Sequence, residues 1–375
     1  MVVVMKPLSS NYASAFRNTK DQNNNGKPFG WGYCQNCLCL QNLPQDRAYF
    51  TTRYHEWVKY SEPDWHFEGI LSKIKNLNNS DSGFKHVIGL SYKDATLVEL
   101  ISKELNIKSH PSDIIGITND WLKIELNSPK KIVSDYIKSI SNGKKSILIA
   151  RRILDHCSSP VEFLDILNCM GKGSLIYIEI NDYYHLVKNY KYDFLWNERT
   201  FYPFKKHFAD IINKTNLGSL DLGSISNKKN ESIVYSFLQV IKENKKPLDN
   251  RIDMTLMEKN LIKDFVNSWY DLKKYWVNIV EKEKVGIIGA SHKGVSFSQL
   301  FFKNVKFLLF DDSLEKKDKY HPDKNILIDP IKNLINNQVN RLVITVDEKW
   351  QDKLKRQVKI IDEKVKLFTF EGVRI

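Results

Sequence analysis

The sequence predicts an α/β protein with two Rossmann-like domains of unequal size, preceded by a small N-terminal module. Three observations support this fold class. Short apolar runs of strand length alternate with stretches of helical periodicity. A strand–helix–strand pattern occupies residues 146–182, and a strand that runs into a Gly-rich turn begins at residue 284. The chain has 375 residues, which is enough for roughly two or three domains of ordinary size.

Residues 146–182 form the clearest predicted unit, a βαβ motif. The apolar run 146–150 has the pattern of a strand covered on both faces. Ser159 and Pro160 suit a helix start, because a Ser oxygen accepts from free N–H groups and Pro fits the first turn. A second apolar run occupies residues 175–178. Ligands bind beyond the carboxyl ends of parallel strands, so we expect a ligand-binding cleft at the polar side chains that follow these runs. They are Arg151, Arg152, Asp155, His156, Glu179 and Asp182.

The formal net charge of +13 comes from Lys residues spread along the whole chain. No basic block with interleaved aromatics would follow a nucleic-acid backbone, so the pattern favours a solvated Lys-rich surface over nucleic-acid binding. The positive field would also favour an anionic small substrate such as a nucleotide sugar. No apolar run approaches the roughly 20 residues that span a bilayer, and no signal peptide is recognisable. We therefore expect a cytoplasmic protein without a membrane partner.

The first large domain is predicted to begin with a strand at residues 86–90, followed by a turn and a helix. A cofactor-binding turn at this place needs small residues and an acidic group for ribose hydroxyls. The next strand is predicted at residues 113–117 and ends at Thr118. Residues 213–230 are polar and predict a surface loop.

Residues 232–281 carry apolar side chains at spacings of three and four. This spacing predicts long amphipathic helices that pack against the neighbouring domains, with Trp269 and Trp276 in the core. The last domain then begins with a strand that runs into a turn containing Gly289 and Gly294. A second strand ends at Asp311 and Asp312, at the distance expected for a ribose-binding acid. By itself this pattern predicts a dinucleotide cofactor and NAD-linked chemistry.

The N-terminal module contains Cys34, Cys37 and Cys39. A Cys-x-x-Cys pair can hold zinc, but a closed structural site needs four ligands. Two interpretations therefore stay open, a zinc site at Cys34 and Cys37 that lacks its other pair, or packed thiols without a metal.

Several segments resemble, in the same order, the three-domain sugar C-methyltransferases of deoxysugar biosynthesis. The N-terminal segments KPLSSN and CQNCLCLQ resemble the second half of the zinc module of that family. The segment ARRILDHCSSPVEF, followed by GSLIYIEIND, resembles its pattern ARHVLEHI-x-DP-x-x-F and G-x-L-x-x-IEVPD. The most specific match is GASHKG followed by FDDSLEKKDKYHP, which resembles G-A-x-x-K-G and V-D-D-x-x-x-K-x-x-x-x-P-G.

The resemblance implies S-adenosylmethionine as the cofactor and a nucleotide-linked keto-sugar as the substrate. Carried over residue by residue, it implies three groups of site residues. The cofactor-binding residues are Gly89, Asp94, Thr96, Thr118 and Arg151. The catalytic residues are Tyr54, Glu198 and His156. The substrate-binding residues are Tyr202, Gly289, Lys293, Gly294 and Asp312.

The sequence departs from the family pattern where the chemistry is expected. Gly89 stands where the family has a strand-end Glu, and Ala95 stands where it has a Gly. The segment 196–199 lacks both His of the block that supplies the base for removing a proton next to a ketone. Two hypotheses follow. One is an S-adenosylmethionine-dependent sugar C-methyltransferase, and the other is a catalytically degenerate relative that serves as a sugar-nucleotide binding or assembly component.

The expected domains follow from these segments. Residues 1–66 form the N-terminal module with its partial zinc-binding-like and aromatic segments. Residues 67–230 form a methyltransferase-like Rossmann domain. Residues 231–283 form a helical connection, and residues 284–375 form a C-terminal Rossmann-like domain.

Overall fold

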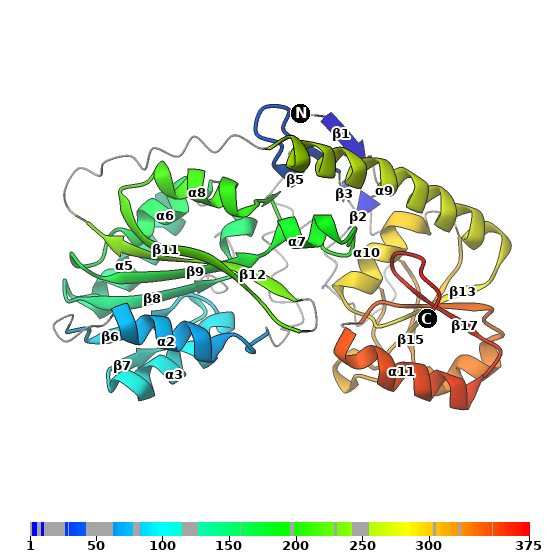
Figure 1. Ribbon diagram of the computed structural model, residues 1–375. Coiled ribbons are helices and arrows are strands. Elements are labelled where there is room, and N and C mark those ends of the chain that lie inside the picture. The colour runs from blue at the N-terminus through cyan, green and yellow to red at the C-terminus, as the bar shows by residue number, and fades with distance from the viewer. Residues whose placement is uncertain are drawn as a thin grey trace.

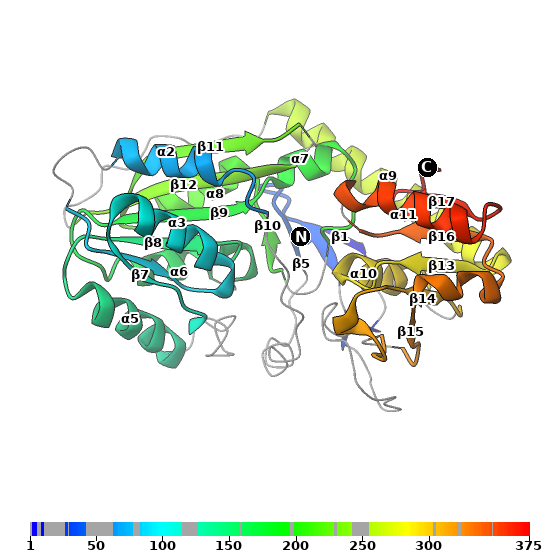
Figure 2. The same cartoon turned by 90° about the horizontal axis from the view of Figure 1, so that it is seen from below.

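The computed structural model describes residues 2–5, 9–10, 27–28, 30–42, 63–77, 83–114, 127–157, 159–195, 199–228, 231–241, 255–302, 305–321, 324–346 and 348–375. Two large sheets lie side by side, and the N-terminal strands lie between them in both views (Figures 1 and 2). This arrangement confirms a mixed α/β fold built on parallel strands. In the described part of the chain, none of the helices is both long enough and apolar enough to span a membrane.

The first sheet has the strand order β11-β12-β9-β8-β6-β7. Its strands β7, β6, β8 and β9 are parallel, whereas β12 is antiparallel to both β9 and β11. The bounds are β6 His86–Gly89, β7 Lys108–His110, β8 Ser146–Arg151, β9 Leu175–Asn181, β11 Leu217–Ser226 and β12 Ser232–Val240.

Helices cover both faces of this sheet. On one face α2 (Phe67–Leu77) and α3 (Ala95–Leu105) bury Ile70 and Val98 against the strands. On the other face α5 (Asn127–Ser141), α6 (Pro160–Leu167) and α8 (Lys205–Asn213) form a second apolar layer. Two short 3₁₀ turns, Tyr92–Asp94 and Leu154–His156, lie where the chain leaves β6 and β8. The sheet is thus buried on both sides, and its carboxyl edge is left for polar side chains.

The predicted βαβ unit is confirmed. Every residue of β8 is buried, as expected for a strand covered on both faces. Helix α6 begins at Pro160 after Ser159, and β9 then pairs in parallel with β8.

Two predictions about the secondary structure of this part of the chain are wrong. Residues 217–226 form β11 and not a surface loop, and residues 232–240 form β12 and not a helix. Val234, Phe237 and Leu238 are buried because the two faces of β12 are both covered, and a doubly covered strand shows no strict alternation. The strand after α3 is β7, and most of the predicted strand 113–117 lies outside the described residues. Because β12 belongs to the first sheet, this sheet continues beyond residue 230, where the methyltransferase-like domain was predicted to end.

The second sheet has the order β15-β14-β13-β16-β17, and all of its strands are parallel. Its apolar faces are covered by α10 (His292–Phe301) on one side and by α11 (Glu348–Ile361) on the other. Two 3₁₀ segments, Leu314–Lys316 and Ile331–Asn337, connect its elements. The strand bounds are β13 Val285–Ile288, β14 Leu308–Phe310, β15 Ile328–Asp329, β16 Arg341–Ile344 and β17 Lys366–Thr369.

A small antiparallel sheet connects the N-terminus to the middle of the chain. Its order is β1-β4-β5-β10, with β1 Val2–Met5, β4 Trp31–Tyr33, β5 Leu40–Asn42 and β10 Phe201–Tyr202. Strands β2 Ser9–Ser10 and β3 Lys27–Pro28 pair separately. Because β10 comes from the segment between α7 (Tyr183–Lys188) and α8, the N-terminal strands are fixed to the first large domain.

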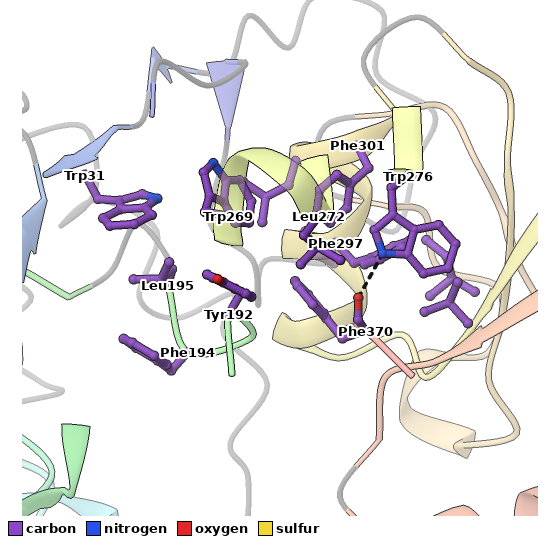
Figure 3. Packing of buried hydrophobic residues seen from close by; sticks show 14 of the residues in the cluster. Trp31, Tyr192, Phe194, Leu195, Trp269, Leu272, Trp276, Phe297, Phe301 and Phe370 are labelled. Carbon is purple, nitrogen blue, oxygen red and sulfur yellow. Dashed lines mark hydrogen bonds between the residues drawn. The ribbon is translucent and has the colours of Figure 1, made fainter. Parts of the chain in front are cut away.

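One apolar core joins the N-terminal strands, the segment that contains α7 and the second sheet. Helix α9 (Leu256–Lys282) crosses from the N-terminal strands to the second sheet (Figure 1). Trp269 contacts Trp31 at 6.2 Å and Tyr192 at 5.2 Å between ring centroids, and Trp276 contacts Phe297 at 5.0 Å (Figure 3). Trp269 and Trp276 are fully buried, which confirms their predicted place in the core.

Candidate functional site

The predicted site residues lie in three places. Gly89, Asp94, Thr96, Arg151 and His156 lie at the carboxyl edge of the first sheet. Gly289, Lys293, Gly294 and Asp312 lie at the corresponding edge of the second sheet. Tyr202, Cys34 and Cys37 lie in the N-terminal sheet and its turn. Tyr54, Thr118 and Glu198 lie outside the described residues.

Asp94 holds the turn after β6. Its Oδ2 accepts hydrogen bonds from the backbone N–H of Leu90 at 2.9 Å, the backbone N–H of Ser91 at 2.8 Å and the Ser91 hydroxyl at 3.2 Å. Its Oδ1 accepts from the backbone N–H of Arg151 at 2.8 Å, so the carboxylate ties the end of β6 to the end of β8. Complete burial raises the pKa of Asp94 to about 6, although these donors act in the opposite direction.

Gly89 makes this turn possible. A Cβ at residue 89 would lie 3.0 Å from the Asp94 Cβ and 3.2 Å from the Val98 Cγ2. The absence of a side chain therefore lets Asp94 fold back over the strand end. Thr96 lies in the first turn of α3 and is exposed. A role for these residues in binding a cofactor stays a prediction, and both oxygens of Asp94 already accept hydrogen bonds from within the protein.

Arg151 is buried, and each nitrogen of its guanidinium donates a hydrogen bond within the protein. Its Nε donates to Glu179 Oε2 at 3.0 Å, and its two Nη atoms donate to the carbonyls of Lys93 at 2.6 Å and Pro63 at 2.7 Å. Glu179 also contacts His66 Nε2 at 2.8 Å. Burial would raise the pKa of Glu179, but the Arg151 charge and the His66 hydrogen bond hold it well below its ordinary value. The described contacts of Arg151 serve the packing of α2 and the turn after β6 against the sheet.

A continuous line of polar contacts follows the carboxyl edge from Glu179 to Arg199. Arg152 donates to Glu179 Oε1 at 3.0 Å and to Asn181 Oδ1 at 2.7 Å. Asn181 Nδ2 donates to the Tyr183 hydroxyl at 3.4 Å, and that hydroxyl donates to Asp155 Oδ2. We name this line the strand-end network. Its members are His66, Arg151, Arg152, Asp155, Glu179, Asn181, Tyr183 and Arg199.

Asp155 is the buried carboxylate of this network that lies beside the predicted catalytic residue His156. Arg199 Nε lies 3.2 Å from its Oδ2. Burial would raise its pKa, but the His156 and Arg199 charges and the Tyr183 hydrogen bond together lower it. Its Oδ1 is buried and has no hydrogen-bond partner within the described ranges. His156 is itself buried in the 3₁₀ turn after β8.

Tyr202 is fully buried and belongs to the joint between the N-terminal sheet and the first domain. Its hydroxyl donates to Asn42 Oδ1 at 3.0 Å, and its ring contacts Tyr183 at 5.3 Å and Phe194 at 5.2 Å between centroids. The structure thus places this predicted substrate-binding residue next to the strand-end network, in contact with Tyr183.

Cys34 and Cys37 lie in one tight turn after β4. The backbone N–H of Cys37 lowers the pKa of the Cys34 thiol, whereas the buried Cys39 Sγ donates to the carbonyls of Leu40 and Tyr202. Throughout the described ranges, no group of three or more His, Cys, Asp or Glu side chains is arranged to hold a metal ion. The structure therefore adds no ligand to the two thiols of the predicted zinc site.

The Gly-rich turn of the second sheet is shaped by close packing. Gly289 has a φ of 102°, in the region that favours glycine. A Cβ at Gly294 would lie 2.1 Å from the Gly289 carbonyl oxygen, so α10 can approach the turn only with glycine there. Asp311 Oδ2 accepts from the backbone N–H of Ala290 at 2.8 Å. The predicted substrate ligand Asp312 instead accepts from the backbone N–H of Ile331 at 2.9 Å.

The two carboxyl edges meet at the first turn of α10. Lys293 Nζ lies 2.8 Å from an oxygen of Asp193, which belongs to the segment after α7. His292 has a pKa well below its ordinary value, first because of burial and then because of nearby cations from both sides. These cations are Lys293, Arg199, Lys316 and Lys93. Arg199, Lys293 and Lys316 each pair with a carboxylate, that of Asp155, Asp193 and Asp311 respectively. An anion at the junction would therefore compete with these carboxylates for the cations.

Sequence reasoning located part of this site. Asp155 and Glu179 follow apolar runs and were placed correctly at strand ends, but their partners His66, Tyr183 and Arg199 come from separate segments. Asn181 ends β9 and Tyr183 begins α7 two residues later, and this position at the end of a buried strand is the signal that could have identified them.

No protein-family model matches the chain, and no curated protein matches it. Solved structures similar to part of it include a SAM dependent methyltransferase from Archaeoglobus fulgidus, at a TM-score of 0.31 and 13% identity, over 46% of this chain and 94% of that chain. Magnesium protoporphyrin IX methyltransferase from Synechocystis PCC 6803, with bound SAH, has a TM-score of 0.30 at 8% identity, over 48% and 90%. A SAM-dependent methyltransferase from Anabaena variabilis has a TM-score of 0.23 at 12% identity, over 48% and 97%. Similarities of this size assign no activity.

Proposed function

We propose that the chain is an S-adenosylmethionine-dependent methyltransferase-like protein that acts on a nucleotide-linked keto-sugar in deoxysugar or surface-glycan biosynthesis. The observation that supports this proposal is the junction of the two carboxyl edges, where Lys93 and Arg199 of one side approach His292 and Lys293 of the other. Parallel sheets bind ligands at such edges, and a diphosphate-linked sugar carries negative charge that Lys93, Arg199 and Lys293 would attract, in competition with the Asp155 and Asp193 carboxylates.

The carboxylates expected to hold the cofactor already have hydrogen-bond partners within the protein. A ribose is usually held by a strand-end carboxylate. Asp94 accepts four hydrogen bonds from within the protein, and Glu179 is bonded to His66, Arg151 and Arg152. These carboxylates could contact a ribose only by giving up internal partners, so we derive no methyl-transfer step from them.

This observation favours a second candidate, a catalytically degenerate relative that binds a sugar nucleotide as a binding or assembly component. Both candidates share the ligand at the junction and differ in whether S-adenosylmethionine is bound and its methyl group transferred. NAD-linked chemistry at the Gly-rich turn is a weaker third idea, because Asp311, the acid nearest the turn, is bonded to Ala290 and Lys316.

Isothermal titration with S-adenosylhomocysteine and with thymidine diphosphate glucose separates the candidates. Binding of both, together with a product one methylene heavier by mass spectrometry of suitable keto-sugar nucleotides, supports the methyltransferase. Binding of the sugar nucleotide alone supports the binding component. Binding of neither contradicts both.

A further inference from the structure

Asp155 carries a buried oxygen that has no hydrogen-bond partner in the described ranges. The residue is 0% exposed, and its Oδ2 accepts the Tyr183 hydroxyl and faces Arg199 Nε at 3.2 Å. The other oxygen, Oδ1, is buried and has no hydrogen-bond partner there. An ionised carboxylate can only accept hydrogen bonds, and buried acceptors are nearly always paired. The unpaired oxygen therefore points to a donor that is not part of these segments.

The position of Oδ1 is fixed by the protein. The backbone carbonyl of Asp155 accepts from the Thr200 N–H at 2.9 Å, and the Thr200 hydroxyl lies 2.6 Å from the Cys157 carbonyl. The Arg199 guanidinium lies over the Tyr183 ring at 5.5 Å. These contacts fix the backbone at Asp155, and Tyr183 and Arg199 hold its Oδ2, so the position of Oδ1 is set before a donor binds.

We propose that Asp155 Oδ1 accepts a hydrogen bond from a ring hydroxyl of a sugar in the bound ligand. This inference rests on the proposed function, because it assigns a ligand contact to the same carboxyl edge. The sequence predicts Asp155 only as one of six polar side chains of a ligand-binding cleft and assigns it no particular group of the ligand.

The surroundings select a hydroxyl among possible donors. Lys93, Arg199 and His156 are the charged groups close enough to influence Asp155, and Lys93 and Arg199 also influence His292 across the junction. A ligand ammonium would meet these cations at close range, whereas a neutral hydroxyl on an otherwise anionic molecule would not. Two sugars have this chemistry, the ribose of an S-adenosyl cofactor and the hexose of a sugar nucleotide.

The test measures binding of S-adenosylhomocysteine and of thymidine diphosphate glucose to the full chain by isothermal titration. Asp155→Asn keeps the volume of the side chain but replaces one acceptor by a donor. We expect it to weaken the probe whose sugar contacts Oδ1 by about tenfold or more, and to leave the other probe nearly unchanged. The probe that weakens identifies the sugar. Glu99→Gln, an exposed change in α3, is the matched control and should leave both affinities unchanged.

A second measurement does not depend on the folding of the variant. Analogues of the bound probe that lack single ring hydroxyls are titrated into the wild-type chain, and one of them should bind about tenfold more weakly. Equal affinities of wild type and Asp155→Asn for a probe that the wild type binds, or equal affinities across the deoxy series, would mean that Oδ1 is met by water and would overturn the inference alone. Failure of the wild type to bind either probe would overturn the proposed function with it.

Discussion

Lys293 of α10 and Asp193 of the segment after α7 form an ion pair between the two large domains, with 2.8 Å between Lys293 Nζ and Asp193 Oδ2. Their side chains are 25% and 16% exposed, so solvent screens the pair only in part. Lys293 was expected to contact phosphate or substrate, and an anionic ligand at this place would compete with Asp193 for the same ammonium group. An anionic ligand that took Lys293 from Asp193 would therefore also break a contact between the two large domains.

We expect Asp193→Asn to destabilise the protein by about 1 kcal/mol at pH 7, because a partly screened ion pair is lost. Burial would raise the pKa of Asp193, but Lys293 lowers it below its ordinary value. A carboxylate with a lowered pKa stabilises the folded state above its unfolded pKa, and this stabilisation is lost as the pH falls through the lowered value. Urea unfolding at pH 7 and near pH 3 should therefore show the difference shrinking in acid. A double-mutant cycle with Lys293→Met should give a matching coupling energy, and strict additivity would contradict the pair.

Glu179→Gln should be among the most destabilising single changes in the first sheet. The neutral amide leaves the buried guanidinium of Arg151 without its counter-charge, and breaking a buried pair in this way costs about 3–5 kcal/mol. Guanidinium chloride unfolding measures the loss. Glu99→Gln on the exposed face of α3 serves as the control and should stay within about 0.5 kcal/mol of the wild type. A similar small effect for both variants would show that Glu179 is not the centre of the network.

The two buried tryptophans of α9 offer a matched comparison. Trp276 Nε1 donates to the Phe370 carbonyl at 2.9 Å, whereas Trp269 Nε1 is buried without a hydrogen-bond partner in the described part of the chain (Figure 3). Both Trp→Phe changes remove the same volume, but only Trp276→Phe leaves a buried carbonyl unpaired. We expect Trp276→Phe to cost about 1–2 kcal/mol more than Trp269→Phe in thermal or chemical unfolding. The reverse order would contradict this account.

Asp94 should show the opposite pH dependence to Asp193. Burial raises its pKa to about 6, from an ordinary value of 3.8. A carboxyl with a raised pKa contributes its full stability below the unfolded pKa and loses it as the pH rises through the folded value. The destabilisation by Asp94→Ala should therefore be larger at pH 3.5 than at pH 7.5, by up to about 3 kcal/mol. Unfolding free energies at several pH values test the slope, and a destabilisation that grows toward alkaline pH would contradict the raised pKa.

The parts of the fold that could be predicted from sequence are those whose pattern has one interpretation. The run 146–150 is too short for a buried helix and is bounded by polar residues, and it forms β8 (Ser146–Arg151) as predicted. The segment 232–240 has an apolar spacing that fits both a helix and a doubly covered strand, and only its pairing with β9 decides between them. The site residues also divide into those predictable from local sequence and those that depend on tertiary contacts. Strand ends were located from local patterns, but the pairing of Asp155 with Tyr183 and Arg199 depends on three segments meeting in space.

The apolar core around α9 has a consequence for work with fragments. Trp31 of the N-terminal sheet and Tyr192 of the segment after α7 both contact Trp269, and Tyr192 also stacks on Phe265 at 4.5 Å. A recombinant piece beginning at α9 would lack Trp31 and Tyr192 and would expose Phe265 and Trp269, as part of an apolar surface of the kind that drives self-association. We expect such a piece to precipitate or form assemblies that the full-length chain does not form.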